Sequence, residues 1–257
     1  MSQRIGITTL LCVLVFACTA MAEPAPATII VLDPGHGGKD RGGFDGKGFR
    51  RNGISVPEDP YTYDVAKRVE RRAAAKGWTV LYTVIDTKDN TIAESDENTI
   101  LPPRKKMIYS GPGKSTTVFP GKKGLLRRLE TEESILGQYP HARIIFISLH
   151  FDYTLSIESG VKIFVPLGMK KHPLAKTLAA RFKSAGHRQV MGYMPMPMIE
   201  ENNRLVVLRE GAIARRVLIE LANFNNKRDR AHMLRSDGRE HYAYIIVSAI
   251  EEYLDKN

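Results

Sequence analysis

Apolar residues along this chain follow two alternating patterns. Short and almost continuous apolar runs are typical of buried strands, and apolar residues at helical spacing are typical of amphipathic helices. Strands are expected at 28–32, 78–84, 143–149, 160–166 and 212–221. Helices are expected at 59–76, 124–138, 172–185 and 240–253. Strands that alternate with helices predict an α/β layer sandwich with a mostly parallel central sheet.

The segment 86–123 interrupts this alternation. It is polar, rich in Pro, Gly, Lys, Ser and Thr, and shows little periodicity. We therefore expect a surface insertion, partly mobile, within an otherwise continuous domain. The sequence shows neither an internal repeat nor a second domain-sized segment, so one domain is expected to span 23–257.

The first 22 residues have the pattern of a secretory signal peptide. Arg4 precedes an apolar stretch at 5–17, and Ala20-Met21-Ala22 forms a small-residue cleavage site. The stretch is too short for a comfortable membrane span, so no transmembrane segment is expected after cleavage following Ala22. We predict a periplasmic or secreted protein. A lipoprotein anchored at Cys18 is the alternative, because the residues before it loosely resemble a lipobox.

Composition adds a basic charge and a lack of structural cysteines. Cys12 and Cys18 both lie in the leader, so an ordinary core must stabilise the exported chain. The formal net charge is +10 and the pI is about 9.6. This balance favours an anionic partner such as a cell-wall polymer or lipid surface, although a merely solvated basic surface explains it equally well. The signal peptide argues against nucleic acid.

Four polar residues stand near the predicted strand and helix ends. His36 follows the first strand in a glycine-rich turn, His150 follows the strand at 143–149, and Glu220 ends the run Val217-Leu218-Ile219. Glu58 stands just ahead of the first helix. The carboxyl ends of parallel strands share one edge. Two imidazoles and one carboxylate can hold a catalytic zinc, and a second carboxylate can act as general base. Spacing leaves open which carboxylate binds the metal.

Each of these residues also has an ordinary structural explanation. His36 fits an incidental surface turn, and His150 fits a hydrogen-bonded core histidine. Glu58 fits the preference for acidic residues near helix N-termini. Glu220 is harder to explain in this way, because an unpaired carboxylate at the end of a buried strand is costly.

Four spaced motifs along the chain surround these polar residues. The first is Asp33-Pro34-Gly35-His36-Gly37-Gly38-Lys39-Asp40, and the second is Glu58 followed by Tyr63, Val65, Ala66 and Val69. The third is Ser148-Leu149-His150-Phe151-Asp152. The fourth joins Leu205-Val206-Val207-Leu208-Arg209 to Val217-Leu218-Ile219-Glu220 and Asn226. Together they resemble the motifs of the zinc-dependent N-acetylmuramoyl-L-alanine amidases of the bacterial cell wall, and the resemblance spans 28–254 apart from the segment 86–123.

This resemblance implies a reaction and a set of roles. It implies hydrolysis of the amide bond between N-acetylmuramic acid and L-alanine, by one amidase catalytic domain with a three-layer α/β/α fold. His36, Glu58 and His150 would hold one Zn2+ per chain, and Glu220 would be the catalytic carboxylate. Arg209 and Asp152 occupy family positions and are candidates for substrate binding.

Two other functions remain open at this point. One is a catalytically weak homologue that binds peptidoglycan without cutting it, and the other is a zinc peptidase that cuts within the stem peptide. The partners compatible with the resemblance are peptidoglycan and an activator protein, and a monomer is expected.

Overall fold

The computed structural model describes residues 26–42, 49–51, 54–88, 90–96, 98–111 and 116–257. The expected signal peptide, with Cys18 and the cleavage site at Ala22, lies outside the described residues and stays a prediction. Among the helices of the described part, none combines the length and apolarity needed to cross a membrane.

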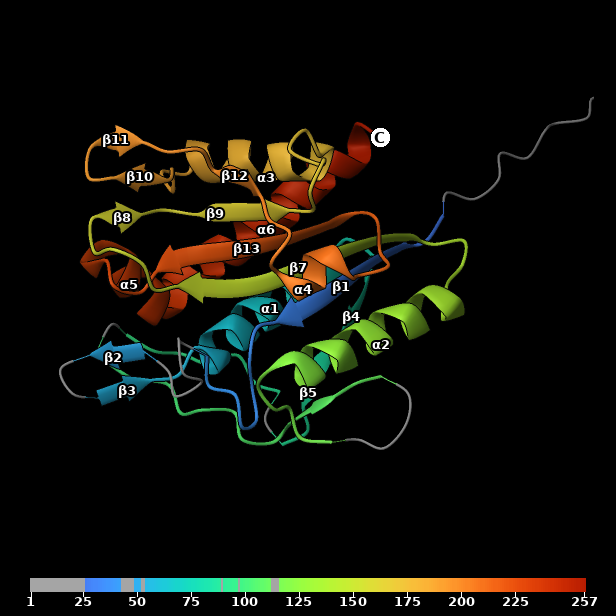
Figure 1. Cartoon of the computed structure of the whole chain (residues 1–257), viewed down its shortest axis with the longest axis horizontal. Coiled ribbons are helices and arrows are strands. Elements are labelled where there is room, and N and C mark those ends of the chain that lie inside the picture. Colours follow the sequence, from blue (N-terminus) through green and yellow to red (C-terminus); the bar gives the residue numbers. More distant parts are fainter. Residues whose placement is uncertain (1–25, 43–48, 52–53, 89, 97, 112–115) are drawn as a thin grey trace, which may run out of the picture.

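A six-stranded sheet forms the centre of the molecule, in the order β12-β9-β13-β7-β1-β4 (Figure 1). Its strands are β1 (Thr28–Pro34), β4 (Thr79–Tyr82), β7 (Arg143–Asp152), β9 (Lys162–Val165), β12 (Ile199–Glu201) and β13 (Arg216–Asn223). The four strands β4, β1, β7 and β13 are mutually parallel. The strands β9 and β12 are parallel to each other, but β9 runs antiparallel to β13. The predicted mostly parallel sheet is confirmed.

Helices cover both faces of this sheet. They are α1 (Asp59–Ala74), α2 (Lys122–Gln138), α3 (Pro173–Ser184), α4 (Val206–Arg209), α5 (Lys227–Leu234) and α6 (Ser236–Asp255). The helix α6 packs against α1, α3 and α5 on one face, whereas α2 and α4 pack together on the other (Figure 1). The predicted three-layer sandwich is therefore present.

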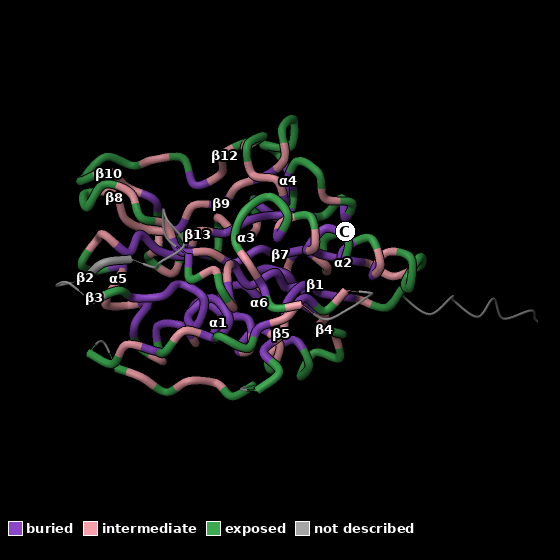
Figure 2. The backbone as a smooth tube through the Cα atoms, turned by 60° about the horizontal axis from the view of Figure 1, so that its bottom comes forward, coloured by how far each residue is buried: buried purple, intermediate pink, exposed green. Residues whose placement is uncertain are grey.

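Side-chain alternation along the strands builds two apolar layers. On β1, Ile30 and Leu32 pack into the larger apolar cluster with residues of α1 and α6, while Ile29 and Val31 pack into the second cluster with residues of α2 and α4. Successive side chains of a strand point to opposite faces, so a near-continuous apolar run suits a sheet covered on both sides. Figure 2 shows the resulting buried backbone through the central strands.

Shorter strands surround the central sheet. They form the pairs β2 (Phe49–Arg51) with β3 (Ile54–Val56) and β5 (Val84–Asp86) with β6 (Met107–Tyr109), and the three-stranded set β8 (Glu158–Ser159), β10 (Val190–Met191) and β11 (Met194–Pro195). The strand β6 lies within the segment 86–123 and pairs antiparallel with β5. The segment therefore returns after about twenty residues to pair with β5 in a separate two-stranded sheet.

The described part of the segment 86–123 is mostly exposed or half-buried, but it contacts the core at several positions. Leu101, Met107, Tyr109 and Val118 are buried and belong to the larger apolar cluster. Met107 and Tyr109 alternate with a half-buried residue, but this pattern covers only the three residues of β6, and Leu101 and Val118 stand apart from it. The sequence pattern therefore did not show their burial.

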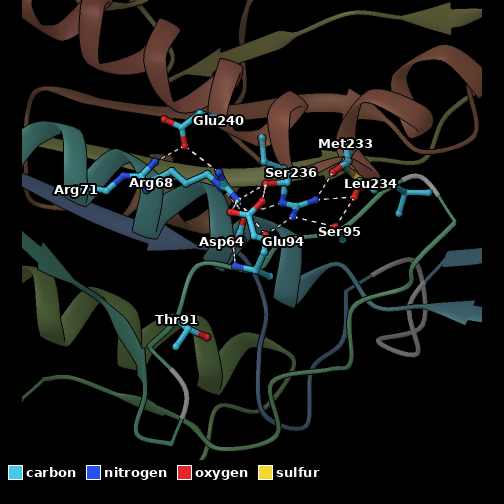
Figure 3. Close-up of polar contacts among 12 residues, drawn as sticks. Asp64, Arg68, Arg71, Thr91, Glu94, Ser95, Met233, Leu234, Ser236 and Glu240 are labelled. Atoms are coloured by element: carbon cyan, nitrogen blue, oxygen red, sulfur yellow. Dashed lines mark hydrogen bonds and ion pairs between the residues drawn. The ribbon is translucent and has the colours of Figure 1, made fainter.

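A buried polar network fastens the same segment to two helices (Figure 3). The Asp64 carboxylate of α1 accepts hydrogen bonds from Arg68 Nε at 2.8 Å, Arg239 Nε at 2.6 Å and the Ala93 amide at 2.5 Å. Arg239, on α6, also donates to the carbonyl of Ala93 and to the Ser95 hydroxyl. Asp64 and Arg239 are fully buried, so this network joins α1, α6 and residues 93–95 without water between them.

Candidate active site and metal centre

A tight turn after β1 holds His36 against the end of β7. The Gly35 amide donates to the Leu149 carbonyl at 2.8 Å. A Cβ on Gly35 would lie 2.5 Å from the His150 ring, so only glycine allows this approach. His36 itself has φ of 66°, a left-handed conformation that is uncommon for a residue with a side chain. Such local strain is typical of functional turns.

His36, Glu58 and His150 converge at the carboxyl edge of the sheet. His36 Nε2 lies 3.1 Å from Glu58 Oε2, and His150 Nδ1 lies 3.2 Å from Glu58 Oε1. The two imidazole rings meet edge to face at 5.1 Å between centroids. One ligand atom from each residue lies within 4.8 Å of the others, so the group can hold a metal ion. Two imidazoles and one carboxylate are a donor set that suits Zn2+ better than Mg2+ or Ca2+.

Glu58 stands at the N-terminus of α1 but does not cap it. Its side chain makes no capping hydrogen bond and instead accepts one from the Phe151 amide at 2.9 Å. It is 3% exposed and faces both histidines. A Cβ on Gly42 would lie 2.4 Å from Glu58 Oε2, so Gly42 leaves room for the carboxylate. The preference of acidic residues for helix N-termini does not explain this orientation.

The site is electrostatically suited to a cation. Burial opposes the charge of Glu58, but the histidines beside it hold the pKa of its carboxyl below its usual range. Burial likewise opposes the charge of His36, but the carboxylates of Glu58 and Asp40 raise the pKa of His36 to about 10. Asp40 lies 2.9 Å from His36 Nδ1. These two carboxylates at two imidazoles attract positive charge, which is supplied either by a proton or by a metal ion.

Glu220 lies beside this group on the neighbouring strand. In the parallel pair of β13 and β7, Glu220 is in register with His150. The strand alternation places Glu220 on the same face as Leu218, which packs in the layer of α2 and α4. Its Oε2 atom is buried, and no residue in the described part of the chain forms a hydrogen bond with it. Burial, together with the carboxylates of Asp152 and Glu58, raises the pKa of Glu220 well above its usual value.

Sequence reasoning missed the ion pair that supports the His36 turn. The Arg128 guanidinium of α2 lies 2.5 Å from Asp33 Oδ1 and donates to the backbone carbonyl of His36 at 2.9 Å. Burial would raise the pKa of Asp33, but Arg128 and the hydroxyls of Ser148 and Thr83 hold it below its usual value. A charged residue inside an apolar strand needs a partner. The position of Asp33 in the apolar strand β1 was therefore the sequence signal that could have predicted a buried cation beside it.

A cavity of about 170 Å³ adjoins the histidines. His36, His150, Arg204 and residues 205–207 contribute to its lining. Arg209 is not among the described residues that line it. Its guanidinium lies 2.6 Å from Glu210 and donates to the Asn203 carbonyl, and its side chain is 46% exposed.

Asp152 lies at the carboxyl end of β7, two residues beyond His150. Its Oδ2 atom is 3.7 Å from Lys162 Nζ, and its Oδ1 atom accepts a hydrogen bond from the Tyr153 amide. Burial raises the pKa of Asp152. Asp152 therefore belongs to the electrostatic surroundings of Glu220, while Arg209 stands further out on α4.

The fold and this site define an α/β protein with a candidate metal centre at the carboxyl edge of its parallel strands. A family model described as N-acetylmuramoyl-L-alanine amidase matches residues 30–252, and the chain belongs to this family. The chain is also 26% identical over 228 residues to a curated Bacillus anthracis protein described as an uncharacterized cell wall amidase. That match covers 88% of this chain but only 35% of the relative, so the chain spans about a third of the relative's length.

Solved amidase structures share the fold. The CwlD amidase from Clostridioides difficile, solved in complex with the GerS lipoprotein, has a TM-score of 0.61 at 18% identity, covering 89% of this chain and 99% of that one. The catalytic domain of CwlV from Bacillus (Paenibacillus) polymyxa var. colistinus has a TM-score of 0.59 at 22% identity, covering 89% and 98%. Ami1 from Mycobacterium smegmatis has a TM-score of 0.59 at 20% identity, and the match covers 90% of this chain and 99% of Ami1.

Proposed function

We propose that this protein is a peptidoglycan amidase that hydrolyses the bond between N-acetylmuramic acid and L-alanine. Membership of the N-acetylmuramoyl-L-alanine amidase family supports the substrate and the bond. The observation that carries the proposal is the convergence of His36, Glu58 and His150, with Glu220 in register beside His150. These are the three ligands and the free carboxylate that metal-assisted amide hydrolysis requires.

Each of the four residues has a distinct role in this proposal. His36, Glu58 and His150 would hold one Zn2+ per chain at this centre. When bound, zinc supplies a Lewis acid that polarises the scissile carbonyl and activates water. Glu220 takes the proton from the attacking water and delivers it to the amine of L-alanine as the amide bond breaks. A raised pKa suits a carboxyl group that must both accept and release a proton near neutral pH.

Two further residues are proposed substrate contacts. Asp152 stands at the carboxyl end of β7, near the reacting carboxylate. Arg209 lies on α4 with Val206 and Val207, which line the cavity beside the histidines. Both sit where parts of a bound muramoyl peptide beyond the reacting amide would extend.

We further propose that the protein acts outside the cytoplasm, after export and cleavage following Ala22. A family of cell-wall amidases fits the leader pattern and the basic charge. The CwlD amidase, similar in fold, was solved with a lipoprotein partner. An activator protein is accordingly included among the partners to be tested, together with peptidoglycan.

Digestion of purified sacculi by the zinc-loaded mature chain tests the function. The wild type should release intact stem peptides that begin with L-alanine, identified by mass spectrometry. Glu220→Gln should lower the rate about 10²–10⁴-fold, because it removes the proton acceptor. The variant should retain its fold and zinc. Glu133→Gln, an exposed change on α2, is the matched control and should leave the rate unchanged.

Other product patterns would contradict the proposal. Trimmed stem peptides still attached to the glycan would indicate a peptidase. Tight binding to sacculi without release, with zinc bound and a periplasmic extract added as a source of activator, would indicate a binding homologue. Full activity in Glu220→Gln would overturn the role of Glu220.

A further inference from the structure

A second group of histidines lies away from the candidate active site. His187 stands in the turn after α3, His232 on α5 and His241 on α6. One ring nitrogen from each lies within 4.8 Å of the others. The helices that carry them pack on the face of the sheet opposite to α2 and α4. None of the three belongs to the motifs or residues that the proposed reaction uses.

The spacing of these nitrogens is close to that of ligands on one metal ion. His187 Nε2 and His241 Nδ1 are 3.4 Å apart. Two imidazoles bound tetrahedrally to zinc, at 2.0–2.1 Å each, hold their nitrogens about 3.4 Å apart. The ring of His232 lies 4.9 Å from that of His187 and 5.8 Å from that of His241, between centroids. Small side-chain rotations would bring all three nitrogens to one centre.

Hydrogen bonding within the protein does not account for this group. A single N–H···N bond can join His187 to His241, but the Nε2 atom of His232 is buried with no hydrogen-bond partner among the described residues. Burial and the neighbouring imidazoles lower the pKa of His187 to about 3 and the pKa of His232 to about 4. The rings of His187 and His232 are therefore neutral at neutral pH, which is the form that binds metals.

The backbone around the three residues is fixed by close packing. A Cβ on Gly238 would lie 1.9 Å from the His232 carbonyl oxygen, so the first turn of α6 contacts α5 directly. The His187 amide donates to the Phe182 carbonyl, and its own carbonyl accepts from the Val161 amide at 3.0 Å. Tyr242 packs its ring against both His187 and His232. The imidazoles thus come from a rigid frame, as a metal site requires.

The residues that line the cavity beside the imidazoles indicate which ions and ligands could bind there. It has a volume of about 490 Å³, and the three histidines line it together with Arg188, Arg228, Arg235 and Asp229. The Oδ2 atom of the Asp229 carboxylate accepts hydrogen bonds from the amides of Gly160 and Asn223. Imidazole-only coordination suits Zn2+, Cu2+ or Ni2+ and not Mg2+ or Ca2+. The arginines favour water-derived or anionic ligands in the remaining position.

We propose that His187, His232 and His241 form a second metal site, which binds Zn2+ through three imidazoles and leaves its fourth position open to this cavity. The ion would tie the end of α3 to α5 and α6. The proposal is independent of the amidase reaction, because it uses none of the residues assigned to that reaction.

Metal counting on a tag-free mature chain tests this site. Wild type, loaded with Zn2+ and desalted, should contain two equivalents by elemental analysis. A His36→Ala/His150→Ala background, which disables the first centre, should keep one. Adding His232→Gln to that background should reduce the content to near zero. His141→Gln in the same background is the matched control, since His141 is exposed and outside both groups, and it should keep one equivalent.

Two further readouts separate the site from a folding defect. Co2+ should give the visible bands of a tetrahedral ion in the His36→Ala/His150→Ala background and lose them with His232→Gln, while circular dichroism stays unchanged. Saturating Zn2+ should raise the melting temperature of the background but not that of the His232→Gln variant. A folded background that binds no metal, or one equivalent that persists in both His232→Gln and His241→Gln, would overturn the proposal.

Discussion

Single residues set the geometry of the candidate metal centre by leaving space. The turn after β1 places His36 in a left-handed conformation, and Gly35 lets this turn approach the His150 ring. Gly42 leaves the volume that the Glu58 carboxylate fills. Ligand orientation in metal sites depends on such surroundings as much as on the ligands themselves. The glycines of this turn are therefore part of the site even though they offer no ligand atom.

Gly42→Ala should weaken the first metal centre. The new Cβ would lie 2.4 Å from Glu58 Oε2 and push the carboxylate away from His36. We expect zinc affinity at this centre to fall about 10–100-fold, the range for changes that disturb ligand orientation. Isothermal titration of a His232→Gln background, which reports the first centre alone, measures the change.

Gly77→Ala is the matched control for this substitution. Gly77 has φ of 74° and Gly42 has φ of 77°, so alanine introduces similar backbone strain at both positions. In the part of the chain that the structure describes, nothing beyond the neighbouring residues lies within 4 Å of the Cβ position at Gly77. Gly77→Ala should lower stability and leave zinc affinity unchanged. Equal loss of affinity in both variants would mean that backbone strain, and not the contact with Glu58, determines the effect.

At the level of elements, strand ends were the most predictable part of the site. The strands β1, β7 and β13 are consecutive neighbours in the sheet. This arrangement brings together three positions: the turn after β1, the end of β7 and the end of β13. Sequence reasoning reached His36, His150 and Glu220 in this way. It also predicted the layers, because apolar runs report that both faces of a strand are covered.

What the sequence could not show depends on contacts between distant segments. The antiparallel direction of β9 leaves no periodic signal, and the alternation that buries Met107 covers only the three residues of β6. The Arg128 contact with Asp33 and the group of His187, His232 and His241 join residues that are far apart along the chain. Only the packing of α2, α3, α5 and α6 brings them together.

Asp64→Ala tests how strongly the buried network holds the elements together. The change would leave the guanidinium groups of Arg68 and Arg239 without their shared carboxylate. Removing one partner of a buried ion pair costs about 3–5 kcal/mol, because the remaining charge stays buried. We expect the free energy of unfolding, from urea denaturation, to fall by about this amount.

Glu94→Gln provides the control within the same network. Glu94 lies 3.6 Å from Arg68, but its side chain is 78% exposed, so solvent screens this contact. Its substitution should change stability little. Because residues 93–95 are joined to Asp64, Asp64→Ala should also increase proteolysis within the segment 86–123. A small loss of stability without new cleavage sites would show that apolar packing alone holds this segment in place.

At the scale of the whole molecule, the positive charge should govern association with the wall. The formal charge of +10 includes Arg4 of the predicted leader, so the mature chain carries 10 − 1 = +9. Peptidoglycan stem peptides carry carboxylates, and salt shortens the range of this attraction from about 10 Å at 0.1 M to about 3 Å at 1 M. Binding of the Glu220→Gln variant to sacculi, measured by co-sedimentation, should therefore weaken at least tenfold over this range. Sucrose at matched osmolality should have no such effect. Affinity that is unchanged by salt would mean that sacculi are recognised by the cavity beside His36 and His150. The basic charge would then belong to a merely solvated surface.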